Sequence, residues 1–154
     1  MGQPQNIRDL PPRARFLMAL GMFFFGGFLL CIATGWIQVD PSSIHAPLWV
    51  LGAIAMVFIL AGVMILLAGH DGLAWLNNPV IWLFVVCLAV PFNWVAFGEG
   101  ERHFTSRSTV MGATSSGAEA ESEGRMIFGI IAVVIDLVVM LVPLYALRKK
   151  RSKD

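Results

Sequence analysis

Asp136 is the residue whose chemistry departs most from its surroundings. It lies in the run 126–147, which carries no other acidic or basic side chain. At about 1.5 Å per helical residue it stands ~15 Å into that run, near the middle of a bilayer core of about 30 Å. Because an aspartate at the centre of a spanning helix costs about 2.5–3.5 kcal/mol, we expect its side chain to face protein or water rather than lipid.

Asp136 has few potential partners within the chain, and three roles stay open for it. No Lys, Arg or His lies in any apolar run, and Asn93 is one of the few polar side chains there. Desolvation favours a neutral carboxylic acid, so a protonated carboxyl bonded to a helix carbonyl is one interpretation. The others are an acid paired with another protein chain and a proton- or ion-coupled transport site. The sequence therefore predicts a partner or proton site at Asp136 and Asn93.

A second set of polar side chains, which we call the polar collar, flanks the apolar runs on the predicted outward side. It consists of Asp40, His45, Glu99, Glu101, Arg102, His103 and Arg107. Nitrogen and oxygen groups of this kind can bind a metal ion, and arginines can hold a phosphate or lipid headgroup through their forked donors. No such ligands are paired at helical spacing, so we predict no metal site. Docking of a partner and a solvated loop with internal ion pairs are the remaining interpretations.

Other chemistry lacks the residues it needs. The apolar runs hold no histidine for a haem, and the chain contains no GxSxG, HExxH or phosphate-cradling glycine motif. Cys31 and Cys87 both lie in apolar runs without a CxxC pattern, which is typical of packing residues. A net charge of +1 without a basic–aromatic patch indicates no nucleic-acid partner. We predict that the protein is not an enzyme and has no cofactor.

The elements that must position these side chains are four long apolar runs. They cover about 16–37, 47–69, 79–97 and 126–147 in a chain that is 57% hydrophobic and only 14% charged. A helix needs about 20 such residues to cross a bilayer, and soluble domains carry about 25% charged residues. The sequence predicts an all-α integral membrane protein, with a four-helix transmembrane bundle as a single membrane domain over 1–154.

Small residues indicate where these helices meet. Ala55, Gly62 and Gly69 recur at heptad spacing in the second run, and small residues let helix backbones approach closely in lipid. In the fourth run, Gly129 and Ala132 share the helical face of Asp136. We expect both sets to face other helices.

The basic residues predict a direction for the bundle. The N-terminal tail holds three Lys/Arg residues and the C-terminal tail five, whereas the long connection 98–125 holds three and the two short connections none. The positive-inside rule then places both termini in the cytoplasm, most simply of a plasma (inner) membrane. The connection 98–125 is rich in Ser, Thr, Gly, Ala and Glu, a composition that favours a flexible outward loop.

Three functions are compatible with these residues. The leading hypothesis is a non-enzymatic accessory or scaffold subunit of a larger membrane protein complex, whose partners are the lipid bilayer and other membrane protein chains. The second is a small proton- or ion-coupled transporter or channel component that uses Asp136. The third is a lipid-headgroup or metal-binding membrane protein that acts at the Glu99–His103 part of the polar collar.

Overall fold

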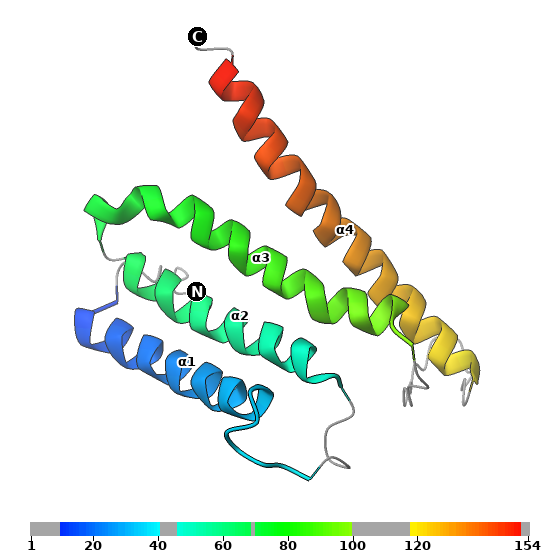
Figure 1. Cartoon of the computed structure of the whole chain (residues 1–154). Coiled ribbons are helices and arrows are strands. Elements are labelled where there is room, and N and C mark those ends of the chain that lie inside the picture. The colour runs from blue at the N-terminus through cyan, green and yellow to red at the C-terminus, as the bar shows by residue number, and fades with distance from the viewer. Residues whose placement is uncertain (1–9, 41–45, 69, 100–117, 152–154) are drawn as a thin grey trace, which may run out of the picture. The chain divides into compact units, whose positions relative to one another are not determined.

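The computed structural model describes residues 10–40, 46–68, 70–99 and 118–151, and these residues fold into helices (Figure 1). The elements in chain order are α1 (Pro12–Ala33), α2 (Leu48–Leu67), the 3-10 helix η3 (Asp71–Leu73), α3 (Ala74–Phe97) and α4 (Ala118–Arg151). No strand occurs in these four described ranges.

Four segments are long and apolar enough to cross a membrane. They are Pro12–Ala33, Leu48–Leu67, Asn78–Phe97 and Gly124–Leu144, each of 20–22 residues. This length matches the ~20 helical residues that a bilayer core requires. The predicted all-helical fold with four such helices is confirmed, and helices of this kind indicate an integral, multi-pass membrane protein in a lipid environment.

The first helix ends four residues earlier than the predicted boundary of 37. Gly35 has φ of 79°, its N–H donates to the Ile32 carbonyl, and the N–H of Trp36 donates to the Cys31 carbonyl. This pair of bonds around a left-handed glycine is the Schellman motif, which satisfies the last carbonyls and stops a helix. Apolar residues continue beyond the stop, so hydropathy alone extends the helix too far.

The last two helices begin earlier than their apolar runs. α3 starts at Ala74 rather than 79, and α4 starts at Ala118 rather than 126, within the segment predicted as a flexible loop. Alanine and glutamate dominate the start of α4; both favour helices, and acids near an N-terminus complement the helix dipole. α3 continues through Pro91 and α4 through Pro143, since spanning helices tolerate proline where neighbours supply partners.

The chain divides into two compact units, Met1–Leu88 and Ala89–Asp154. The first contains α1, α2 and the beginning of α3; the second contains the end of α3 and α4. The division describes contacts within the chain, so the single membrane domain remains a prediction.

In the first unit, α1 and α2 lie side by side and antiparallel (Figure 1). A Cβ atom placed on Gly26 would lie 2.9 Å from the Ala55 carbonyl oxygen, and one placed on Gly62 would lie 3.2 Å from that of Ala19. Ala19 and Ala55 are 1% and 0% exposed. Two backbones that approach this closely have no space for a larger side chain, which is how small residues hold helices together in lipid.

Candidate functional site

Small residues form the contact between the end of α3 and α4 in the second unit. Ala89 and Ala96 are 8% exposed, and Ala132 is fully buried. A Cβ atom placed on Gly129 would lie 3.8 Å from the Ala96 Cβ, an ordinary contact distance. This seam brings two polar side chains together, because Asn93 lies between the α3 alanines and Asp136 lies one helical turn beyond Ala132.

Asn93 donates two hydrogen bonds through its side-chain amide. Nδ2 donates to the Asp136 carboxylate oxygen Oδ1 at 3.0 Å and to the Ala89 carbonyl at 3.1 Å. A carbonyl only accepts, so the Ala89 carbonyl fixes which way the amide points. The bond to Asp136 joins residues 43 positions apart in sequence and is the polar link between α3 and α4 at this level.

Asp136 retains one oxygen for another partner. Its side chain is half-buried, and within the described part of the chain the hydrogen bond to Asn93 engages Oδ1 alone. An ionised carboxylate would present Oδ2 as an acceptor, whereas a protonated one would present it as an O–H donor. Asn93 can donate to Oδ1 in both states. The site can therefore receive either a donor or a carbonyl from outside the chain.

Arg125 holds the end of α3 from the neighbouring helix. Its Nε donates to the Ala96 carbonyl at 3.4 Å, and its Nη2 donates to the Gly98 carbonyl. The last carbonyls of a helix lack intrahelical donors, and α3 has no basic residue in its own last turn. The guanidinium supplies the missing donors and interacts favourably with the negative end of the helix dipole.

This role of Arg125 was not predicted, because the composition of 98–125 favours a loop that would include it. A signal was present: Arg125 is the basic residue immediately before the fourth apolar run. What could not be read from one sequence is that this position lies level with the end of α3.

Within its own unit, most of the surface of α4 is uncovered. Of the residues Gly124–Leu144, only Ala132 is buried, whereas α2 has five buried residues. The aromatic rings of Phe92 and Phe128 lie 5.8 Å apart with a tilt of 38° and add a contact across the seam. Most remaining large side chains of α4 point away from it, Ile130 and Met140 being 62% and 63% exposed.

The polar collar lies mostly outside the described residues. Asp40 and Glu99 are described and exposed, whereas the other five members fall in segments that are not described: His45, Glu101, Arg102, His103 and Arg107. No group of three or more His, Cys, Asp or Glu side chains with metal-binding geometry occurs among the described residues. The collar as a site therefore stays a prediction.

The small residues singled out in the sequence occupy two different seams. Ala55 and Gly62 lie against α1, while Gly129 and Ala132 lie at the contact of α4 with the end of α3. Gly69 falls outside the described residues. Cys31 and Cys87 are not joined in a disulfide.

No family of sequences, curated protein or solved structure matches the chain. The class defined by the fold is a helical, multi-pass membrane protein, and the function must be argued from the chain's own side chains. The hydrogen bond between Asn93 of α3 and Asp136 of the largely exposed helix α4 is the feature that carries this argument.

Proposed function

We propose that the protein is a non-enzymatic accessory or scaffold subunit of a larger membrane protein complex, and that α4 is the helix that binds the partner. The observation that carries this proposal is the half-buried Asp136 carboxyl, which has one oxygen bonded to Asn93 and lies on a helix with little other cover. A polar group in the hydrocarbon core is stable only when its hydrogen-bonding capacity is met.

The second carboxyl oxygen favours a partner helix over lipid. Lipid tails offer no hydrogen-bond donor or acceptor, so Oδ2 would be unsatisfied against them at a cost of several kcal/mol. A helix from another chain with a polar or basic side chain at this depth would satisfy it. The exposed Val133 and Met140, one helical turn before and after Asp136, supply apolar area on either side of that contact.

The predicted orientation belongs to the same proposal. Both termini lie in the cytoplasm of a plasma (inner) membrane, and the basic tail Arg148–Arg151 anchors the end of α4 at anionic lipid. An activity reporter fused to the C-terminus tests this: a signal confined to the outer side of the membrane contradicts the orientation.

Native mass spectrometry of the protein, extracted in a mild detergent or in nanodiscs, tests the subunit function. We expect foreign chains at a fixed ratio to this chain, and their loss in Asp136→Leu. Asp136→Asn keeps an acceptor for Asn93 and a polar group at the second position, so it should retain part of the partner. Thr34→Val is the matched control, since it removes a polar side chain from the end of α1, where, among the described residues, Thr34 donates only to carbonyls of its own helix.

Two results would overturn the subunit function. A monodisperse lone monomer in native membranes would leave Asp136 without a partner chain. A homo-oligomer of this chain would instead assign the protein to transport, if its assembly is unchanged by Asp136→Leu and the unsubstituted protein conducts ions or protons in liposomes.

A further inference from the structure

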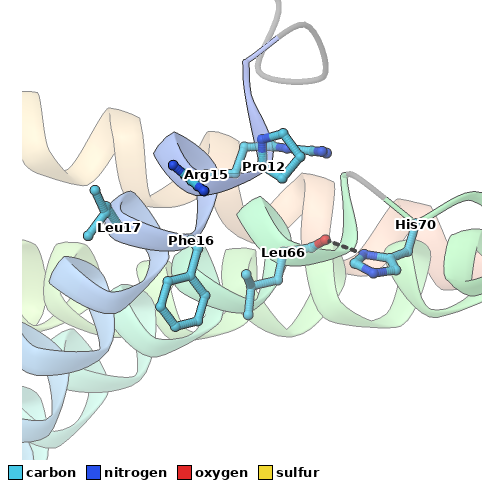
Figure 2. A pocket seen from close by; sticks show the side chains of 7 residues that line it. Pro12, Arg15, Phe16, Leu17, Leu66 and His70 are labelled. Carbon is cyan, nitrogen blue, oxygen red and sulfur yellow. Dashed lines mark hydrogen bonds between the residues drawn. The ribbon is translucent and has the colours of Figure 1, made fainter.

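A cavity lies between the start of α1 and the end of α2, within the first unit (Figure 2). Its volume is about 550 Å³, and the side chains that matter for its chemistry are Arg13, Arg15, Phe16, Leu17, Leu66 and His70. Ligand sites in proteins span about 300–1,000 Å³. The cavity is therefore far larger than a single inorganic anion needs and suits part of a larger molecule.

Arg15 brings an unsatisfied cationic donor to this cavity. Its Nε is buried and, within the described residues, has no hydrogen-bond partner. A buried donor without a partner costs about 1–3 kcal/mol, and more when it is charged. An anionic ligand at the cavity mouth would remove that cost if the Arg15 side chain turned toward it.

The charge around Arg15 favours an anion. The first turn of α1 contains Arg13 and Arg15 and no acidic residue. A helix N-terminus carries about half a positive charge and normally attracts acids, so two arginines there add to that charge. Guanidinium groups bind phosphate through two parallel N–H donors, and a phosphate bound by these arginines would lower the positive charge of this end of α1.

His70 limits the opposite wall. Its Nδ1 lies 3.0 Å from the Leu66 carbonyl (Figure 2), and because a carbonyl only accepts, Nδ1 must carry the hydrogen. The side chain thereby caps the end of α2 and leaves Nε2 for a second contact. His70, which follows α2, is thus held in place by the last turn of that helix.

In a bilayer spanned by α1 and α2, the cavity would lie at the level of the lipid headgroups. α1 begins its spanning segment at Pro12 and α2 ends its own at Leu67, so both walls are the ends of apolar helices. Phe16 and Leu17 are 59% and 65% exposed and point apolar surface along the membrane below the arginines. Charge at the headgroup level above apolar surface matches an amphiphile with an anionic head.

We propose that this cavity binds an anionic phospholipid, with Arg13 and Arg15 on the phosphate and with Phe16, Leu17 and Leu66 along the first part of an acyl chain. The proposal concerns a different unit from the α4 site and does not depend on the subunit function. Anionic lipid could also gather around any basic residue by charge alone, without a cavity. The control variant therefore removes a positive charge that lies away from the cavity.

Lipid titration followed by native mass spectrometry of the delipidated full-length protein tests the site. We expect phosphatidylglycerol to bind with at least about tenfold higher affinity than phosphatidylcholine. Arg15→Gln should lower the affinity for phosphatidylglycerol about tenfold, which corresponds to ~1.4 kcal/mol. Lys153→Gln removes the same charge near the C-terminus, outside the tail Arg148–Arg151, and should change the affinity less than about twofold.

A second variant keeps the test valid if Arg15→Gln disturbs folding. Leu66→Trp fills the cavity while both arginines remain, so it should also lower phosphatidylglycerol affinity without changing the protein's charge. Equal binding of the two lipids, or an equal loss in Lys153→Gln, would overturn the proposal. Full competition by inorganic phosphate at millimolar concentration would likewise overturn it, because it would identify a site for a free anion that does not use the apolar wall.

Discussion

The two helix pairs of this protein differ in what is added to the contact between their small residues. α1 and α2 meet through backbones so close that a Cβ on Gly26 would lie 2.9 Å from the Ala55 carbonyl oxygen, and the described residues show no polar side-chain bond between the two helices. The end of α3 and α4 meet through Asn93, Asp136 and Arg125. In lipid the hydrophobic effect does not drive helices together, so either close packing or hydrogen bonding must do so.

The difference separates a fixed contact from one that can be shared. Close packing uses the whole interface and tolerates little change in geometry. A hydrogen-bonded contact uses few atoms and leaves the rest of α4 uncovered, which is what a partner-binding helix requires. Under the proposed function, α1 and α2 form the scaffold, and α4 is the element that another chain completes.

The largest effect should come from filling the close contact. We expect Gly26→Val to lower the free energy of unfolding by about 1–3 kcal/mol, the usual cost of overpacking, because the new side chain would meet Ile59 and the Ala55 carbonyl. The measurement is reversible unfolding of the purified protein in mixed micelles, followed by circular dichroism.

Gly27→Val is the matched control for this variant. It makes the same substitution one position along the helix, where a Cβ atom would meet nothing within 4 Å. Equal destabilisation by the two variants would show that helix propensity, rather than close packing, decides the stability of the α1–α2 pair.

A smaller effect is expected from the polar link. In a double-mutant cycle of Asn93→Ala and Asp136→Ala, we expect a coupling of about 0.6–1.7 kcal/mol, the range for interhelical hydrogen bonds in membranes. The two side chains lie 3.0 Å apart, so the single losses should not add. Additive losses would mean that the bond contributes nothing and that the seam is held by its alanines.

The smallest effect should distinguish the two aromatic contacts. Phe25 and Phe58 lie 4.7 Å apart, edge to face at 74°, whereas Phe92 and Phe128 lie 5.8 Å apart at 38°. Edge-to-face pairs contribute about 0.5–1.5 kcal/mol beyond burial. Cycles of Phe→Leu variants should therefore give a coupling in that range for the α1–α2 pair and a lower one for the α3–α4 pair. A larger coupling energy for Phe92 and Phe128 would contradict the view that α1 and α2 form the fixed contact.

Much of the fold follows from the sequence because a bilayer imposes length and apolarity on any helix that crosses it. Helix ends do not follow in this way, since local hydrogen bonds set them: Gly35 stops α1 while apolar residues continue, and α4 begins among polar ones at Ala118.

The candidate site follows only in part. The cost of a central acid selects Asp136 by residue type, but its bond to Asn93 depends on the relative height of two helices, which spacing along one chain does not define. The same geometry hides the role of Arg125 at the end of α3. The cavity near Arg15 requires two helix ends to coincide, which no single apolar run reveals.

The Arg125 bonds to the Ala96 and Gly98 carbonyls have a consequence for synthesis. A ribosome adds about 5–20 residues per second, so Arg125 is made roughly a few seconds after the end of α3. During that interval the nascent chain holds a helix terminus whose carbonyls have not met their guanidinium, and an Asn93 whose carboxyl partner does not yet exist. Translation of α4 therefore supplies the hydrogen-bond donors for the end of α3. A ribosome that stalls between the two helices leaves a chain in which these carbonyls lack the Arg125 guanidinium.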